Sequence, residues 1–410
     1  MKIRVQKFGG TSVATSERRE RVVHHIRQAL NEGCRVVAVV SAMGRKGDPY
    51  ATDTLLDLVS ENGESLSSRE HDLLLSCGEI ISASTLSSLL NREGIPNVVL
   101  TGGQAGIITN NRHTNAQILT INPTRVKNEL EKGKVVVLAG FQGKTTDGEI
   151  TTLGRGGSDT TATALGVAIE ADIVDIFTDV EGIMTADPRI VEDASPLDAV
   201  TYSEICNLAF QGAKVIHPRA VELAMQTNVP IRVRSTMSDH PGTLVSSTHE
   251  KNQLAGEVSD RLITGITQVA NVTQIKVPAG EGQYDLQLKV FKAMSENDIS
   301  VDFININPSG VIYTVFDHEA DQAEKILRSM DLTPSLMSGC AKVSVVGAGI
   351  AGVPGVMSKI AEALTEEDIP ILQSADSHTT IWVLVPGENM VQAVRSLHRK
   401  FGLHKVQMMY

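Results

Sequence analysis

Lys7-Phe8-Gly9-Gly10-Thr11-Ser12 follows a run, residues 1–6, in which apolar and polar side chains alternate as they do in a first strand. The two glycines let a ligand approach the backbone closely, and a lysine and two hydroxyls flank them. Such groups can hold an oligophosphate. A P-loop would need a second glycine and a lysine at a fixed spacing, and none follows. A nucleotide held by this loop is therefore held by a different scheme.

A second glycine-rich loop, Gly154-Arg155-Gly156-Gly157-Ser158-Asp159, precedes a helical pattern. Ser158 or Asp159 can cap that helix, and the free N–H groups at a helix start attract anions. Arg155 can form paired hydrogen bonds with a carboxylate or a phosphate. An ordinary capped helix has no need of an arginine between glycines, so the sequence favours an anion-binding loop.

Residues 1–235 alternate strand-like and helix-like segments. Short apolar, β-branched runs are typical of strands buried in a mostly parallel sheet. They lie at residues 3–5, 36–40, 98–100, 135–139, 173–177 and 231–233. Helical patterns at 22–33, 69–92 and 157–171 separate some of these runs, and Asp147-Gly148 is typical of a hairpin tip. The alternation predicts a three-layer αβα domain, that is, an α/β fold.

After residue 235 the sequence becomes polar and rich in turns, as in a linker. Two similar stretches of about 70 residues follow, each with strands and helices in the order of a βαββαβ (ferredoxin-like) module. We expect a catalytic domain at 1–240, a linker at 241–262, and two modules at 263–335 and 336–410. Residues 347–352 match GxGxxG, but too few residues follow them for a dinucleotide-binding domain.

Composition excludes several classes of protein. The net charge is −11 and aromatic residues make up 3% of the chain, which argues against a nucleic-acid partner. The apolar runs are too short for a membrane helix, and the first residues lack the apolar region of a signal peptide. Four cysteines without CxxC spacing are typical of reduced thiols in a cytoplasmic protein.

Taken together, the ordered motifs resemble the amino-acid kinase superfamily and, within it, the aspartate kinases. The resemblance covers the whole chain, and the two C-terminal repeats resemble paired ACT domains. The motifs lie at residues 7–12, 41–44, 52–53, 77–79, 101–106, 140–143, 154–161, 178–182, 185–189, 214–215 and 232–235.

The resemblance implies that the protein moves the γ-phosphoryl group of ATP, with Mg²⁺, onto the β-carboxylate of L-aspartate. The product is 4-phospho-L-aspartate, at the start of the pathway to lysine and diaminopimelate, threonine and methionine. A carboxylate with a pKa of about 4 is already ionised at neutral pH, so no general base is needed. Catalysis should then rest on in-line positioning and charge cancellation, which lysines and backbone N–H groups supply.

The resemblance also implies a role for individual residues. Lys7 stabilises the transferring phosphoryl group and Lys214 neutralises the other side of the phosphates, while Glu79 binds the substrate ammonium and Arg155 its α-carboxylate. Further substrate contacts are expected from Ser41, Thr52, Gly156, Gly157 and Ser158. Further nucleotide contacts are expected from Phe8, Gly9, Gly10, Thr178, Asp179, Met184, Asp187, Arg189 and Val215. Mg²⁺ should bridge phosphate oxygens and stay largely hydrated, so no protein ligand is named. His71, His113 and His217 need no role in this chemistry.

The paired modules imply an amino-acid effector, with lysine, threonine and meso-diaminopimelate as candidates. Gln373, Asp376 or Ser377 either lies near that effector or forms a polar surface between modules, and the two interpretations are equally open. Residues 278–284 replace the Pro-Gly turn found at 354–355, so both modules need not bind an effector alike. We expect a homodimer or a higher homo-oligomer, because a single module leaves a strand edge uncovered.

Two other functions stay open from the sequence. One is another amino-acid kinase such as glutamate 5-kinase, because a pocket rejects one extra methylene by only about 1–3 kcal/mol. The other is a catalytically silent amino-acid sensor. The presence of Lys7, Glu79, Arg155 and Lys214 argues against a sensor, which would not need all four.

Overall fold

The computed structural model describes residues 1–60, 66–213, 215–247, 262–280, 285–350 and 353–404. These residues form two compact units. The first unit holds Met1–Ile183, Pro196–Ala209 and 215–247. The second unit holds Met184–Ser195, Phe210–Ala213 and the described residues from 262 to 404.

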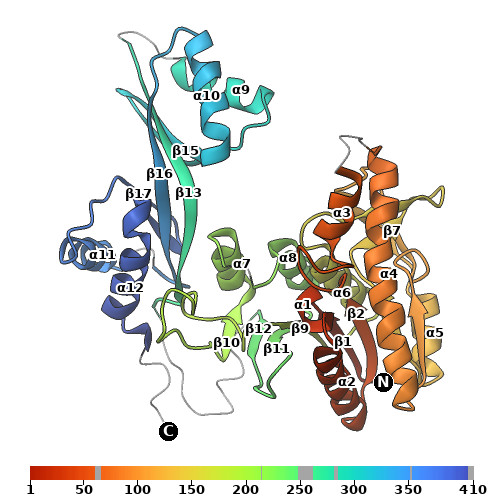
Figure 1. Ribbon diagram of the computed structural model, residues 1–410. Coiled ribbons are helices and arrows are strands. Elements are labelled where there is room, and N and C mark those ends of the chain that lie inside the picture. The colour runs from red at the N-terminus through yellow and green to blue at the C-terminus, as the bar shows by residue number, and fades with distance from the viewer. Residues whose placement is uncertain (61–65, 214, 248–261, 281–284, 351–352, 405–410) are drawn as a thin grey trace. The chain divides into compact units, whose positions relative to one another are not determined.

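An eight-stranded sheet, in the order β10-β12-β11-β9-β1-β2-β6-β3, forms the centre of the first unit (Figure 1). The strands from β11 to β3 pair in parallel and confirm the six strands that the apolar runs predict. They are β11 (Ile231–Ser235), β9 (Ile173–Thr178), β1 (Ile3–Phe8), β2 (Arg35–Val40), β6 (Val135–Ala139) and β3 (Asn97–Leu100). At one edge, β12 (Thr243–Ser246) runs antiparallel to β11 and parallel to β10 (Ala199–Thr201). β12 lies inside the stretch expected to be a linker.

Helices cover both faces of this sheet, which confirms the three-layer α/β fold. On one face, α2 (Ser16–Asn31) and α4 (Ser68–Arg92) share a core with Val36, Ala38 and Val40 of β2. On the other face, α6 (Gly157–Ala168) approaches so closely that a Cβ on Gly166 would lie 2.6 Å from Val174 Cγ2. The remaining helices are α1 (Gly10–Val13), α3 (Thr52–Ser60), α5 (Thr124–Glu131), α7 (Tyr202–Phe210) and α8 (Pro218–Thr227).

Helix α4 is long and apolar enough to cross a membrane by length and composition alone. It nevertheless behaves as a core helix, because Leu75, Leu86 and Leu90 are buried within the first unit. The lengths of uninterrupted apolar runs in the sequence do not single out α4, because serines and charged residues interrupt the apolar runs of this helix.

A smaller sheet, in the order β5-β4-β7-β8, leads the chain into the second glycine loop. Its strands are β4 (Ile107–Thr109), β5 (Ile118–Ile121), β7 (Gln142–Lys144) and β8 (Ile150–Thr152). β7 and β8 are antiparallel, and the Gly148 N–H donates to the Thr145 carbonyl at 3.1 Å. This confirms the predicted hairpin, which ends two residues before Gly154.

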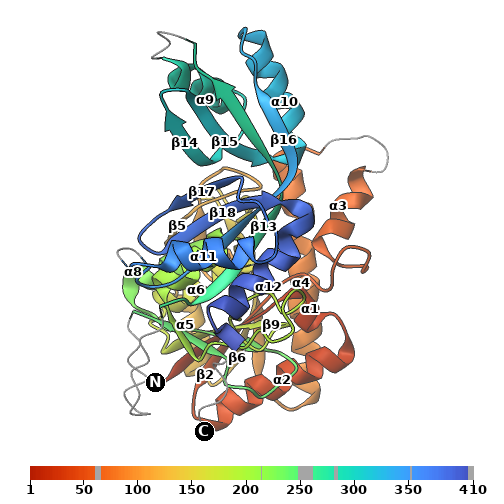
Figure 2. The ribbon, with the colours of Figure 1, turned by 90° about the vertical axis from the view of Figure 1, so that its left-hand side faces the viewer.

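The second unit is built on an antiparallel six-stranded sheet in the order β14-β15-β13-β16-β18-β17 (Figure 2). The strands are β13 (Gly265–Pro278), β14 (Asp302–Asn307), β15 (Gly310–Phe316), β16 (Ser335–Val346), β17 (Gln373–Asp376) and β18 (Thr380–Pro386). β13 and β16 have 14 and 12 residues and run through both halves, so the two repeats share one sheet. β17 begins at Gln373, and Ile369 before it is buried in the core of the second half.

Each half of this sheet carries two helices. α9 (Leu286–Glu296) and α10 (Asp317–Ser329) pack on the first half, and α11 (Val356–Thr365) and α12 (Met390–Lys400) on the second. The order of strands and helices confirms the duplicated pattern expected from the sequence.

The segment Met184–Ser195 follows β9 in the chain but belongs to the second unit. Ala186 and Val191 are buried in one core with side chains of β16 and α12. The Thr185 carbonyl accepts a hydrogen bond from the Ile266 N–H at 2.8 Å, and the Thr185 hydroxyl lies 2.9 Å from Nε2 of buried His398. This segment is therefore packed with the six-stranded sheet, although the sequence places it in the catalytic stretch.

Candidate active site

Three adjacent parallel strands, β9, β1 and β2, end at the edge of the main sheet where open α/β folds bind ligands. The loop after β1 and the loop after β2 are pressed together. The Gly44 N–H donates to the Gly10 carbonyl at 3.0 Å, and a Cβ on Gly10 would lie 2.7 Å from the carbonyl oxygens of both Ala42 and Gly44. Only glycine fits at position 10, because the loop after β2 occupies the space that a side chain would need. The close approach of a ligand that the sequence predicts stays a prediction.

An ion pair joins the end of β1 to the first turn of α6. Lys7 Nζ is 2.6 Å from Asp159 Oδ1, and the two side chains are only 13% and 11% exposed. A Cβ on Gly9 would lie 3.6 Å from the same Nζ. Asp159 Oδ2 accepts a hydrogen bond from the backbone N–H of His217 at 3.2 Å. The lysine ammonium is thus held where the two glycine-rich loops meet.

The second glycine loop takes a backbone conformation that glycine favours. Gly154 and Gly156 have φ of +72° and +70°, and a Cβ on Gly156 would lie 2.2 Å from Cγ of His217. Gly156 is the N-cap of α6, and no side chain caps this helix. The expectation that Ser158 or Asp159 caps it is wrong, because the Asp159 carboxylate bonds to Lys7 and His217 instead. Arg155 is exposed, and no carboxylate in the described part of the chain lies within ion-pair distance of it.

Glu79 supplies a buried carboxyl group beside the loop after β2. Its side chain is on α4, the residue is 2% exposed, and Oε1 accepts a hydrogen bond from the Ala42 N–H at 3.1 Å. Oε2 has no hydrogen-bond partner among the described residues. Burial raises the pKa of Glu79 to about 8, and the bond from Ala42 opposes this only in part. A buried acceptor without a partner is costly, so this oxygen is suited to a cationic ligand.

The remaining residues expected to bind the amino acid lie around these groups. Ser41 is half-buried directly after β2, and its N–H donates to the Phe8 carbonyl at 3.1 Å. Thr52 is half-buried at the start of α3, and Ser158 is buried in the first turn of α6. Gly157 has no room for a side chain, because a Cβ there would lie 2.6 Å from the Phe141 ring.

The residues expected to bind nucleotide are placed less uniformly. The Phe8 ring is fully buried and stacks on Phe177, so only its backbone faces the loop. Thr178 ends β9, and Asp179 forms an ion pair with Arg45 at 2.8 Å. Arg45 lies one residue beyond the sequence motif at 41–44.

Other expected nucleotide residues lie outside this group. Met184, Asp187 and Arg189 belong to the second unit. The Arg189 guanidinium bonds to the Asp187 carboxylate at 2.7 Å and lowers the pKa of that carboxyl group. Lys214 lies outside the described residues. Val215 is half-buried, two residues before His217 in the chain.

Sequence reasoning missed the use of two acidic residues. Asp159 looked like a helix cap, since an aspartate in a first helical turn commonly has that use. Asp72 is fully buried on α4 and bonds to His113, one of the histidines that need no role in the proposed chemistry. His217 is structural too: its Nδ1 accepts the Arg219 N–H at 3.3 Å and caps α8.

One group of three side chains in the described part of the chain has metal-ligand spacing: His24, His25 and Asp239. Each of the three side chains already makes a hydrogen bond within the protein, although Nδ1 of His25 has no partner among the described residues. The Arg21 guanidinium is 2.9 Å from Asp239 Oδ1, and His25 Nε2 is 2.9 Å from the Thr236 carbonyl. Burial lowers the pKa of His25 to about 4. An ion-pair network accounts for this group better than a metal site.

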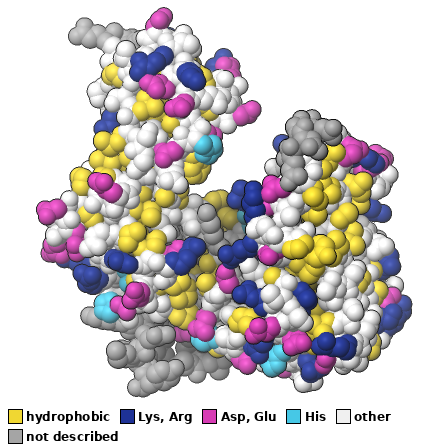
Figure 3. All heavy atoms as spheres, viewed as in Figure 1, with side chains coloured by type: hydrophobic (Ala, Val, Ile, Leu, Met, Phe, Trp, Pro, Cys, Tyr) yellow, Lys and Arg dark blue, Asp and Glu magenta, His cyan; other side chains and the backbone are white. Residues whose placement is uncertain are grey.

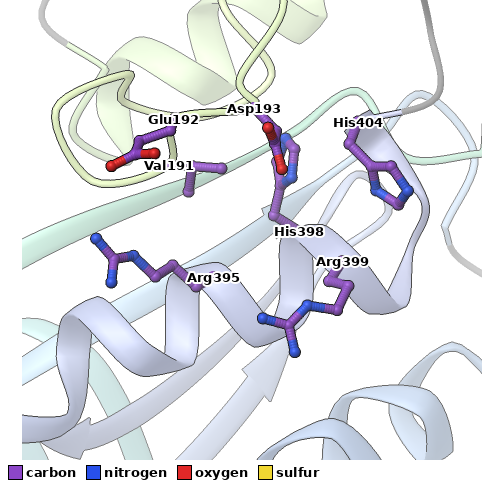
Figure 4. Close-up of a pocket in the computed structure, with 7 residues that line it drawn as sticks. All are labelled: Val191, Glu192, Asp193, Arg395, His398, Arg399 and His404. Carbon is purple, nitrogen blue, oxygen red and sulfur yellow. The ribbon is translucent and has the colours of Figure 1, made fainter.

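The second unit contains a cavity of about 460 Å³. Arg395 and Arg399 of α12 lie on one side of it, with Glu192 and Asp193 of the segment Met184–Ser195 on the other (Figure 4). The Arg395 Nε donates to the Ile190 carbonyl at 2.8 Å. No residue expected at the active site lines this cavity.

Comparison with known proteins identifies the family of the chain. The amino acid kinase family model matches residues 2–235, and an ACT domain model matches residues 335–399. Aspartokinase 1 of Bacillus subtilis (strain 168) is 59% identical over 405 residues, covering 99% of this chain and 100% of the relative. Aspartokinase of Geobacillus stearothermophilus is 40% identical, covering 98% of each chain.

Solved structures resemble the whole chain as well. Aspartate kinase from Synechocystis has a TM-score of 0.82 and 27% identity, covering 99% of both chains. E. coli aspartokinase III in complex with aspartate and ADP has a TM-score of 0.79 and 25% identity, covering 97% of this chain and 99% of that one. The same enzyme in complex with lysine and aspartate has a TM-score of 0.75 and 25% identity, covering 98% and 99%. From the family model and the full-length identity to curated aspartokinases, this chain belongs to the aspartokinase family of amino acid kinases.

Proposed function

We propose that the chain phosphorylates the β-carboxylate of L-aspartate with ATP at the ends of β9, β1 and β2. The observation that carries this proposal is the Lys7–Asp159 ion pair, because it holds one cation where two glycine loops meet. A polyanion that reached both loops would be in contact with this ammonium. The complex of E. coli aspartokinase III with aspartate and ADP supports the same pair of ligands.

The nucleophile needs no activation, since the aspartate β-carboxylate is ionised at neutral pH. The barrier comes mainly from bringing an anion against a triphosphate, so positioning and charge cancellation supply the catalysis. Lys7 neutralises the charge on the transferring phosphoryl group, and Asp159 keeps its ammonium in place. The backbone N–H groups of Gly9 and Gly10 add donors beside it, and Lys214 covers the other side of the phosphates.

The amino-acid end of the substrate needs one acidic and one basic partner. Glu79 binds the ammonium group through Oε2, which has no partner among the described residues. Arg155 binds the α-carboxylate from the turn before α6, with Ser41, Thr52, Gly156, Gly157 and Ser158 around the two. A buried acidic partner together with an exposed arginine suits a zwitterion better than a neutral ligand.

Nucleotide contacts come from Thr178 and Asp179 at the end of β9, and from Met184, Asp187, Arg189 and Val215. Mg²⁺ supplies charge neutralisation on the phosphate oxygens. The carboxylates of Asp159 and Asp179 are already paired with Lys7 and Arg45, which fits an ion held mainly by phosphate oxygens and water.

The test of this proposal is an assay of ADP release and of acyl-phosphate trapping with hydroxylamine. We expect ADP release that depends on L-aspartate, and hydroxamate from L-aspartate but little from L-glutamate at the same concentration. Equal hydroxamate from both amino acids would favour the glutamate 5-kinase reaction. ATP hydrolysis that ignores aspartate would favour a silent sensor.

We also propose that the second unit binds an amino-acid effector. A pocket of about 410 Å³ lies between the start of α11 and β17, and Gly355, Met357, Ser374, Asp376 and Ser377 are among the residues that line it. Gln373 behaves differently: its amide joins the Gln274 side chain at 2.7 Å and the Phe303 carbonyl at 2.5 Å. Its contacts favour the polar pairing surface for Gln373 and leave Asp376 and Ser377 for the effector.

Replacement of Asp376 by alanine is expected to raise the effector concentration for half-inhibition about tenfold, the loss of one charge-assisted contact. Activity without effector should stay unchanged. The measurement is inhibition by lysine, threonine and meso-diaminopimelate in turn, with Asp321→Ala on α10 as a surface control in the same unit. Unchanged inhibition by all three amino acids in the Asp376 variant would place the effector elsewhere.

An edge strand, the free cysteines and the distribution of charge support proposals about assembly, location and partners. β14 is an edge strand whose Ile304 and Ile306 are 46% and 55% exposed, so we propose that a second copy of the chain covers this edge in a homodimer. The four cysteines are free, which supports a cytoplasmic location. On the face drawn in Figure 3, acidic and basic side chains are interspersed, which supports the proposal that no nucleic acid binds.

A further inference from the structure

Asp72 is a fully buried acidic residue that none of the proposed steps uses. It lies on α4 and is 0% exposed. His113 Nδ1 is 2.9 Å from Oδ2, and the Thr114 N–H lies 3.0 Å from both carboxylate oxygens. The Thr152 hydroxyl donates to Oδ1 at 2.5 Å. Burying a carboxylate is costly unless several donors surround it, so this arrangement calls for an explanation.

The carboxylate holds a turn in a conformation that its residue disfavours. Thr114 has φ of +69°, which is rare for any residue except glycine and more so for a β-branched one. Its side chain is exposed, so packing does not impose this conformation. The bond from the Thr114 N–H to Asp72 does, since it fixes the backbone of the turn against α4. Strained residues of this kind gather where a protein positions functional groups.

This turn lies directly against the second glycine loop. A Cβ on Gly154 would lie 3.2 Å from the Thr114 carbonyl oxygen and 2.8 Å from Asn115 Oδ1. The Ala116 N–H donates to the Thr152 carbonyl at 2.9 Å, so the turn and the end of β8 are joined as well. Asp72 therefore accepts hydrogen bonds from the Thr114 backbone and the Thr152 side chain, in the two segments that border Gly154, the residue before Arg155.

We propose that Asp72 is a positioning residue for Arg155. By holding Thr114 and Thr152, it fixes the place from which the flexible glycine turn presents the guanidinium to the substrate α-carboxylate. Gly154 and Gly156 give Arg155 little restraint of their own, and a shift of about 1 Å in a positioning group can cost a hundredfold in rate. This inference rests on the proposed role of Arg155 and adds the part of the chain that sets its geometry.

The test is the kinetics of Asp72→Asn. Asparagine keeps the shape of the side chain, but its amide NH₂ group cannot accept the hydrogen bonds that one carboxylate oxygen accepts. We expect the KM for aspartate to rise about tenfold or more, while the KM for ATP changes less than about twofold. KM does not depend on the fraction of folded enzyme, so lower stability alone does not produce this split. Glu70→Gln is the matched control: the Glu70 side chain is on the same helix and 43% exposed, and this variant should match the wild type.

A second change separates positioning from bulk destabilisation. Glycine takes positive φ without strain, so Thr114→Gly added to Asp72→Asn should restore part of the lost affinity for aspartate. If Asp72→Asn does not fold, Thr152→Val removes one donor only and should raise the KM for aspartate alone. An unchanged KM for aspartate in the folded variants, or an equal rise for ATP, would overturn the inference.

Arg155→Ala, measured in the same assay, separates this inference from the proposed function. If Arg155→Ala raises the KM for aspartate and Asp72→Asn does not, only the positioning role is wrong. If Arg155→Ala leaves that KM unchanged, the proposed role of Arg155 is wrong, and the positioning role falls with it.

Discussion

Replacement of Lys7 by methionine is expected to lower kcat about a thousandfold, while the KM for aspartate changes little. The ammonium group of Lys7 lies where the two glycine loops meet, 2.6 Å from the Asp159 carboxylate. Removing one preorganised charge that faces a developing anion typically costs about a hundred- to a thousandfold in kcat, and phosphoryl transfer depends on such charges throughout. The measurement is steady-state ADP release with saturating ATP and aspartate.

Two further variants make this result specific. Lys2→Met, at an exposed position beside the same strand, should keep the wild-type kcat. Lys7→Met leaves the nearly buried Asp159 carboxylate without its cation, so thermal stability should fall as well. Lys7→Met combined with Asp159→Asn should recover stability but not activity. A kcat within about tenfold of the wild type in the single variant would show that Lys7 does not touch the reacting phosphate.

Replacement of Glu79 by glutamine is expected to lower kcat/KM for aspartate about a hundredfold or more. Glutamine keeps the shape and the bond from the Ala42 N–H, but it carries no charge for the substrate ammonium. Losing one member of a buried, hydrogen-bonded charge pair costs roughly 2–5 kcal/mol, which corresponds to this range. The KM for ATP should stay near the wild-type value, and Glu70→Gln is again a suitable control.

The pH dependence gives a sharper test of Glu79. Burial raises its pKa to about 8, so in the free protein the group holds a proton at neutral pH. Binding the ammonium requires the ionised form, and a proton must leave on binding below pH 8. The KM for aspartate should therefore fall by up to about tenfold per pH unit as pH rises from 6 to 8. In Glu79→Gln this slope should disappear; a slope that persists would assign the titration to another group.

The raised pKa of Glu79 also predicts how the stability of the protein depends on pH. The pKa of the carboxyl group is about 4.5 in the unfolded chain, whereas the folded group stays protonated until about pH 8. The folded state thus binds the extra proton, and the free energy of unfolding without ligand decreases as pH rises through this window. Above pH 8, Glu79→Gln should be more stable than the wild type. Urea unfolding of both proteins at about pH 5, 7 and 9 measures the difference.

Much of the fold follows from local sequence pattern. A run such as Val36–Val40 can only be buried on both faces, and six such runs predict the six parallel strands that the structure contains. A glycine in a loop also indicates that another group lies too close for a side chain. At Gly10, a Cβ would touch a backbone carbonyl oxygen. These inferences succeed because one residue, or one short run, determines the outcome.

The rest depends on partners that lie far away in the sequence. Asp159 in a first helical turn looks like a cap until the fold brings Lys7 to it from β1, 152 positions earlier in the chain. Thr114 shows no local sign of its positive φ, because Asp72 on another helix imposes it. Likewise, the lengths of β13 and β16, which merge the two repeats into one sheet, depend on pairing between the repeats. Local pattern contains none of this information.

The segment Met184–Ser195 limits how the chain can be cut. A fragment that stopped after β12 would keep this segment but lose β16 and α12, so Ala186 and Val191 would face water instead of the core that now buries them. Thr185 would lose His398 as well. The C-terminal half is therefore not a detachable regulator, and a trimmed kinase would carry an unsupported loop in the middle of its own sequence.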